Sequence, residues 1–175
     1  IRNGINTQLF APDSKLKLKN RNEYSLNTQD FVIGMIARFD EQKDHKNLFK
    51  ALKKLENLRF KCVLIGDKIS NNNNKLLSLI QSYSLGDKIK ILEKSTNIYQ
   101  VITCLDLHVL SSSHGEGFPN VVAETMSAGI PNIVTDIGDS NLIVGQKEWV
   151  VEPKSPDVLT KKINNLYEIF YNNKR

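Results

Sequence analysis

From residue 31 onward, short apolar runs alternate with amphipathic stretches. Runs with the length of buried β-strands lie at 31–37, 60–65, 88–92, 107–110, 133–135 and 149–151. Apolar residues recur at helical spacing over 47–58, 75–84, 98–105 and 119–128, and a last helix begins at Pro156 and reaches about residue 170. The central runs are apolar at consecutive positions, which predicts a sheet covered on both faces. Together these features predict an α/β fold with a doubly wound, Rossmann-like parallel sheet.

The first 30 residues follow a different pattern. They are polar, carry an Asn-Gly pair at 3–4 and a proline at 12, and predict an irregular linker that leads into a domain. We therefore divide the 175 residues into a linker at 1–30 and one domain at 31–175, a length that is ordinary for a single core. Because the chain begins with Ile1 rather than Met, we interpret it as a piece of a longer protein.

The net charge of +5 is unevenly distributed. Residues 1–61 hold 13 Lys or Arg against 7 Asp or Glu, and residues 62–175 hold 11 against 12. A basic region can bind nucleic acid or an anionic membrane. Lysines outnumber arginines 19 to 5, however, and Lys50, Lys53 and Lys54 fit a solvated helix face. We therefore expect no nucleic-acid partner and leave peripheral contact with a membrane open.

The two cysteines and the lengths of the apolar runs bear on the cellular compartment in which the protein works. Cys62 and Cys104 lie in apolar surroundings without metal-ligand spacing, which predicts buried thiols in a reducing environment. No apolar run is long enough to cross a bilayer. We expect a cytoplasmic protein, and any membrane contact would be at the inner face.

The loop after strand 107–110 has the richest chemistry. It carries Glu116 between Gly115 and Gly117, then runs into a helix that carries Glu124. In such sheets, ligands bind at the carboxyl ends of the strands. Free N–H groups at a helix start suit a diphosphate, and a carboxylate can accept hydrogen bonds from two neighbouring hydroxyls. The loop therefore suits a phosphorylated sugar or a nucleotide.

A second loop, after the first strand, adds positive charge at the same edge. Arg38 follows that strand directly and Lys43 comes five residues later, so both could neutralise a diphosphate. No Asp-x-Asp pair is present to hold a divalent ion against such a ligand, so we expect no metal site. The chain also lacks the Gly-x-x-x-x-Gly-Lys loop of NTPases and the Gly-x-Ser-x-Gly turn of hydrolases.

The stretch Glu116-Gly-Phe-Pro-Asn-Val-Val-Ala-Glu124, with Ala128-Gly-Ile-Pro131 after it, resembles the donor-site signature of the family 4 retaining glycosyltransferases. Further segments match in order: Asn3-Gly4-Ile5-Asn6, Gly34 to Lys43, Val63 to Asp67 and Thr135 to Asp139. The resemblance covers nearly the whole chain. It departs at Lys68 and Asp139, where the family pattern has glycine.

The resemblance implies the C-terminal half of a GT-B fold, which holds a nucleoside-diphosphate sugar with UDP or GDP as the carrier. It implies a catalytic set of Arg38 and Lys43 on the diphosphate and Glu116 on the sugar hydroxyls, with Glu124 on the ribose. The other implied contacts are Gly117, Phe118, Pro119 and Asn120 with the sugar and phosphates, and Gly66 and the turn from Leu92 to Lys94 with the base.

The resemblance also implies the reaction. A hexosyl or N-acetylhexosaminyl group would pass, with retention and without a metal or other cofactor, to a cell-surface glycan or lipid-linked acceptor in polysaccharide biosynthesis. The N-terminal acceptor half and a final helix would lie outside these residues, so we expect this chain alone to bind a donor without transferring sugar. Two alternatives stay open: another GT-B enzyme such as a sugar-nucleotide epimerase, and a nucleotide-binding module without chemistry.

Overall fold

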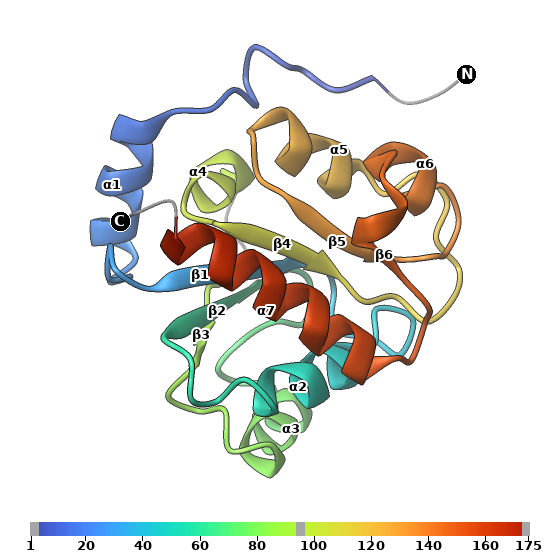
Figure 1. Cartoon of the computed structure of the whole chain (residues 1–175). Helices are drawn as coiled ribbons and strands as arrows, with labels where there is room; N and C mark the ends of the chain where they lie inside the picture. The colour runs from blue at the N-terminus through green and yellow to red at the C-terminus, as the bar shows by residue number, and fades with distance from the viewer. Residues whose placement is uncertain (1–3, 94–96, 173–175) are drawn as a thin grey trace.

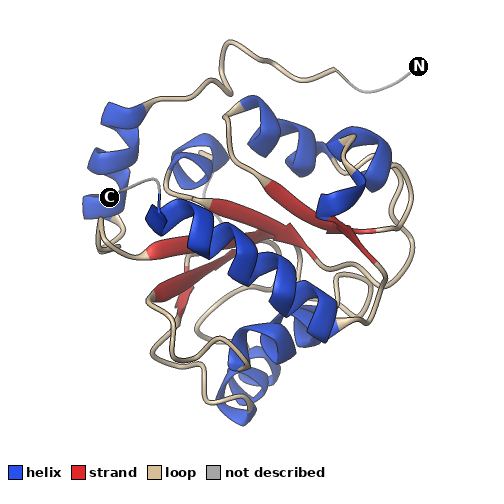
Figure 2. Ribbon diagram, in the orientation of Figure 1, coloured by secondary structure: helices blue, strands red, loops and turns tan. Residues whose placement is uncertain are grey.

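The computed structural model describes residues 4–93 and 97–172, which form a six-stranded parallel sheet with helices on both faces (Figures 1 and 2). The strands are β1 (Phe31–Ile36), β2 (Phe60–Ile65), β3 (Ile89–Ile91), β4 (Leu107–Leu110), β5 (Asn132–Thr135) and β6 (Val150–Val151). Their order is β3-β2-β1-β4-β5-β6, and every neighbouring pair is parallel. This confirms the predicted doubly wound α/β fold. The order reverses between β1 and β4, so the loops after these two strands diverge from one point of the sheet edge.

Seven α-helices lie among the described residues. They are α1 (Ser14–Glu23), α2 (His45–Lys53), α3 (Asn74–Ser82), α4 (Ile98–Thr103), α5 (Asn120–Ser127), α6 (Ser140–Val144) and α7 (Pro156–Asn172). A 3₁₀ turn, Lys147–Trp149, precedes β6. The helix predicted over 47–58 is shorter than expected, because the chain continues as turns after Lys53. None of the described helices is long and apolar enough to cross a membrane.

The strand side chains divide between two cores, one on each face of the sheet. Ile33 and Met35 of β1 pack with side chains of α2, α3 and α7, whereas Val32 packs with those of α4. This two-sided burial explains why the strands are apolar at consecutive positions. Cys62 lies in the first core and Cys104 in the second, both as free buried thiols, as expected. Burial raises the pKa of each thiol to about 12.

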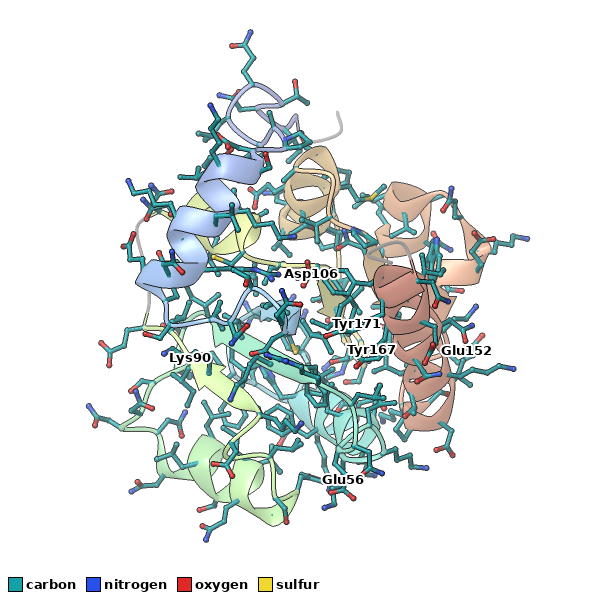
Figure 3. The ribbon with its side chains drawn as sticks, turned by 60° about the vertical axis from the view of Figure 1, so that its left-hand side comes forward. Glu56, Lys90, Asp106, Glu152, Tyr167 and Tyr171 are labelled. Atoms are coloured by element: carbon teal, nitrogen blue, oxygen red, sulfur yellow. The ribbon has the colours of Figure 1, made fainter. Side chains whose placement is uncertain are left out.

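Helix α7 closes the first core from outside. Figure 1 shows it crossing the sheet diagonally beside α2. Its aromatic side chains contact the start of β1, with the ring of Phe31 edge-on to Tyr167 and Phe170 at centroid distances of 5.6 and 5.1 Å. The hydroxyl of Tyr171 donates to the carbonyl of Gln29 at 2.6 Å. Tyr167 and Tyr171 lie on the side of α7 that faces the sheet (Figure 3).

The N-terminal segment corrects the sequence-based expectation. Residues 1–30 are not an irregular linker throughout, because Ser14–Glu23 form α1, capped by a hydrogen bond from the N–H of Leu16 to the Asp13 carboxylate. Figure 3 shows Asp106 between α1 and the sheet. Arg21 Nη2 lies 2.6 Å from Asp106 Oδ2, with side chains only 3% and 2% exposed. Helix α1 is therefore attached to the domain by a buried ion pair. Residues 1–3 lie outside the described part of the chain.

Several of the basic residues that give the first third its surplus charge are paired with carboxylates of the domain. Besides Arg21, Lys17 pairs with Asp106 and Arg59 pairs with Asp30. The number of Lys and Arg side chains in residues 1–61 is therefore larger than the number of them that are left unpaired at the surface.

We predict that Asp106→Ala lowers the free energy of unfolding by about 3–5 kcal/mol, because it leaves Arg21 buried without a counter-charge. Urea denaturation measures the change. Asp157→Ala is the matched control, since it removes a carboxylate that pairs with Lys54 on the surface, and it should cost less than about 1 kcal/mol. Equal effects of the two substitutions would show that the buried pair does not anchor α1.

Candidate functional site

The loops after β1 and β4 are joined where the strand order reverses. The N–H of Ser113 donates to the carbonyl of Gln42 at 2.8 Å, and Gln42 Nε2 donates to the carbonyl of Gly115 at 2.8 Å. Ser111 Oγ donates to the carbonyl of Asp44 at 3.1 Å. The two loops therefore form one connected surface at the carboxyl edge of the sheet, where doubly wound folds bind their ligands.

An ion pair between Lys43 and Glu116 lies within this surface. Lys43 Nζ contacts Glu116 Oε1, with side chains 15% and 6% exposed. Ser112 Oγ donates to the same carboxylate oxygen at 2.5 Å. Two residues that the sequence analysis placed on separate loops are thus in direct contact.

Arg38 lies on the same loop but is not part of this pair. Its guanidinium donates to the carboxylate of Asp40 and, at 2.6 Å, to Gln42 Oε1. The side chain is 52% exposed, so it can exchange these partners for a ligand without breaking a buried contact. The carboxylate partner of Arg38, two residues away, was not predicted from the sequence.

Helix α5 begins without a side-chain cap. The first four helices each begin with a side-chain acceptor for a backbone N–H, supplied by Asp13, Asp44, Asn73 and Asn97. The residue before α5 is Pro119, which has no such acceptor. The positive end of α5 therefore lacks a counter-charge from its own cap and is suited to an anionic ligand.

The backbone of the β4–α5 loop is supported by the loop after β5. At Gly138 the backbone has φ +59°, and a Cβ there would lie 2.2 Å from the carbonyl oxygen of Glu116. The N–H of Asp139 donates to the carbonyl of Gly117 at 3.0 Å. Gly138 is thus required for the close approach that fixes Glu116, a role that the sequence analysis missed.

The residues predicted near a base lie further along the same edge. A Cβ on Gly66 would come within 2.2 Å of the carbonyl oxygen of Ala37, so this glycine allows the ends of β1 and β2 to approach. The N–H of Leu92 donates to the carbonyl of Leu64 at 2.9 Å. Lys94, the last residue of the predicted turn, lies outside the described residues.

Glu124 is a half-buried carboxylate on α5. Its side chain has no hydrogen-bond or ion-pair partner among the described residues, and desolvation raises its pKa. Along the loop that leads to it, Gly117 and Asn120 are exposed, Phe118 is half-buried and Pro119 is buried. The arrangement offers a diphosphate two cations and a helix N-terminus, with Glu116 and Glu124 available to accept from hydroxyls.

The chain is similar in sequence to known glycosyltransferases. The sequence profile of the family described as Glycosyl transferases group 1 matches residues 17–172. EpsF of Bacillus subtilis (strain 168), whose name is that of a glycosyltransferase, is 29% identical over 136 residues, which cover 77% of this chain and 35% of EpsF. The lipopolysaccharide core biosynthesis glycosyltransferase LpsD of Rhizobium meliloti (strain 1021) is 31% identical, covering 60% of this chain and 29% of LpsD. The chain thus spans about a third of these relatives.

Solved structures show the same fold. A glycosyltransferase from Rickettsia africae ESF-5 superposes with a TM-score of 0.88 at 26% identity, covering 97% of this chain and 47% of that one. Anabaena Alr3699/HepE in complex with UDP-glucose gives a TM-score of 0.87 at 24% identity and 98% and 48% coverage. The match to half of each solved chain fits the expectation that this domain is one half of a GT-B fold.

We predict that Glu124→Gln raises the melting temperature of the ligand-free protein at pH 7. Burial disfavours the charged carboxylate, so the folded state binds its proton more tightly than the unfolded state does. Stability is therefore lost as pH rises from the ordinary glutamate pKa through the raised folded pKa, and glutamine avoids this loss. Thermal unfolding from acid to neutral pH measures the difference, which should vanish below the ordinary pKa. The exposed Glu168→Gln should show no such trend.

Proposed function

This chain belongs to the group 1 glycosyl transferases, and from that membership we propose that it is the donor-binding half of a metal-independent, retaining glycosyltransferase of polysaccharide biosynthesis. The observation that carries the proposal is the Lys43–Glu116 ion pair beside the uncapped start of α5. A cation, a helix N-terminus and a carboxylate with hydroxyl-binding capacity are what a sugar joined to a diphosphate requires.

The donor diphosphate would lie between Lys43, Arg38 and the N-terminus of α5. Lys43 is already held at the site by Glu116 and needs no large movement, whereas Arg38 would leave Asp40. A bound phosphate would share the charge of Lys43, and the Glu116 carboxylate would turn part of its hydrogen-bonding capacity to the sugar hydroxyls. The backbone of residues 117–120 would contact the sugar and phosphates.

The nucleoside would extend from the diphosphate along the sheet edge. Glu124 has no partner to displace in the described part of the chain, so its carboxylate can accept from the two ribose hydroxyls. The base would lie near Gly66 and Leu92. UDP is the nucleotide we favour, because Anabaena HepE, which shares the fold, was solved with UDP-glucose.

Retention at the anomeric carbon follows if both bond changes occur on one face of the sugar. The bond from the anomeric carbon to the β-phosphate oxygen breaks, and its electron pair stays on that oxygen. The acceptor hydroxyl attacks the same carbon from the same face and gives its proton to the departing oxygen. Lys43 and the start of α5 would stabilise the developing negative charge. Neither Glu116 nor Glu124 bonds to the sugar in this scheme.

We further propose that protein charges alone neutralise the diphosphate. Within residues 4–93 and 97–172, no group of three or more His, Cys, Asp or Glu side chains is placed to hold a metal ion. The transferred group would be a hexose or an N-acetylhexosamine and the acceptor a surface glycan or lipid-linked sugar, bound by a second domain. The enzyme would work in the cytoplasm, in peripheral contact with the inner face of the membrane.

A thermal-shift panel of UDP, GDP, ADP and CDP, each with and without a sugar, tests donor binding. We expect one base to stabilise the 175-residue chain, by about 2.7 kcal/mol at 100 times its dissociation constant. We expect no sugar transfer and no epimerisation by the chain alone. Stabilisation by none of the nucleotides would contradict the proposal.

The site assignment is tested by calorimetry with the nucleotide that the panel selects. Lys43→Ala and Glu124→Ala should each weaken binding about 10- to 100-fold, because each removes charge-assisted hydrogen bonds. Lys50→Ala is the matched control, since it removes an exposed lysine of α2. Wild-type affinity in both site variants would place the nucleotide elsewhere.

A further inference from the structure

A second cavity lies beside the donor site and shares none of its four charged residues. Its volume is about 760 Å³, within the range of about 300–1,000 Å³ that small-molecule sites occupy. The lining residues are Phe39, Asp40, Glu41, Asp44, His45, Lys46, Lys68, Asn73, Lys75, Leu79, Ser113, His114 and Lys154. They come from the loops after β1, β2, β4 and β6, from the start of α2 and from α3.

The wall of this cavity contains a buried histidine without a hydrogen-bond partner. His45 is 2% exposed, and neither of its ring nitrogens has a hydrogen-bond partner among residues 4–93 and 97–172. Its ring stands edge-on to Phe39 at a centroid distance of 5.2 Å. Burial lowers the pKa of His45 to about 4, so at neutral pH the ring offers one N–H donor and one acceptor nitrogen. The ring also stands edge-on to Phe49 at a centroid distance of 6.3 Å, so His45 gives the wall of the cavity a neutral aromatic surface.

Four lysines surround the same space. Lys46, Lys68, Lys75 and Lys154 are all exposed, and none of their ammonium groups has a hydrogen-bond or ion-pair partner among the described residues. They come from four separate segments, so their convergence is a property of the fold rather than of a local lysine run. Together they provide an anion-binding rim.

Three carboxylates also line the cavity, and two of them are already engaged. Asp40 is paired with Arg38 and accepts from the N–H of Lys43. Asp44 caps α2 by accepting from the N–H of Asn47. Glu41 is exposed. The lining therefore keeps a surplus of unpaired positive charge.

Two of the four lysines adopt a backbone conformation that disfavours a side chain. Lys68 has φ +61° and Lys154 has φ +58°, both in the left-handed region. Lys68 also stands where the family pattern has glycine, the residue that this conformation favours. The chain thus places an ammonium group at the cavity at a conformational cost. Strain of this kind is typical of functional sites.

We propose that this cavity is a second binding site, for a small organic phosphate with an apolar portion. The phosphate would lie among the lysines, and the apolar portion against Phe39, Leu79 and the edge of the His45 ring. The site is separate from the donor site, because Arg38, Lys43, Glu116 and Glu124 are all outside its lining.

Phenyl phosphate is a suitable probe, titrated into the 175-residue chain with detection by calorimetry and by the ring resonances of His45. We expect binding that shifts these resonances and that weakens about tenfold or more in Lys68→Gly. This variant removes the ammonium group and inserts the residue that the backbone favours, so the fold should gain stability. Lys75→Gln is a second variant with the same expected loss.

Two control variants distinguish binding in this cavity from binding to other surface lysines or to the donor site. Lys161→Gln, an exposed lysine of α7 outside the cavity, should bind the probe as the parent does. Glu124→Ala should also keep full affinity for the probe, although it weakens nucleotide binding, because Glu124 lies outside the lining of the cavity. Absence of binding would overturn the proposal, and so would affinity that depends on Glu124 but not on Lys68 and Lys75. Neither outcome affects the nucleotide measurements above.

Discussion

The ion pair between Lys43 and Glu116 joins the two loops that leave the sheet on opposite sides of its reversal in strand order. Both partners are largely removed from water, so the pair adds little to stability once the cost of desolvation is counted. Its value is geometric. It fixes a cation and a carboxylate beside the open end of α5, in the positions where a ligand would need them.

The Lys43–Glu116 ion pair depends in turn on neighbouring residues that hold Glu116 in place. The buried Ser112 hydroxyl donates a hydrogen bond to the Glu116 carboxylate, and Gly138 allows the loop after β5 to approach the backbone of Glu116. Bulk at Gly138 would displace Glu116 and, through it, Lys43. The second cavity lies behind the same loops, and its lining includes Ser113 and His114, the residues just before Gly115 and Glu116. One connected pair of loops thus borders two ligand-sized spaces of different chemistry.

The sequence was sufficient to predict the sheet and the presence of Lys43 and Glu116 at one edge of it, although not their direct contact. Strands buried on both faces are apolar at consecutive positions, and the rule for parallel sheets brings their following loops to one edge. It was not sufficient for α1, because this helix turns the polar Asn20 and Arg21 toward the domain instead of an apolar stripe. The ion-pair partner of Arg21 is Asp106, which lies 85 residues away in the sequence. A pair so far apart in the chain leaves no local sequence signal. The partners of Arg38 and the unpaired ring of His45 likewise appear only once the loops are placed.

Mapping amide chemical shifts of the labelled chain during titration with UDP and, separately, GDP tests the central claim most directly, because it locates the nucleotide residue by residue. The account predicts that at least one of them most strongly perturbs Lys43, the loop residues Gly117 and Phe118, and the start of α5 at Asn120 and Val121. Smaller effects are expected at Glu124 and Gly66. Perturbations confined to residues away from the carboxyl edge of the sheet, with Lys43 and the start of α5 unchanged for both nucleotides, would contradict it.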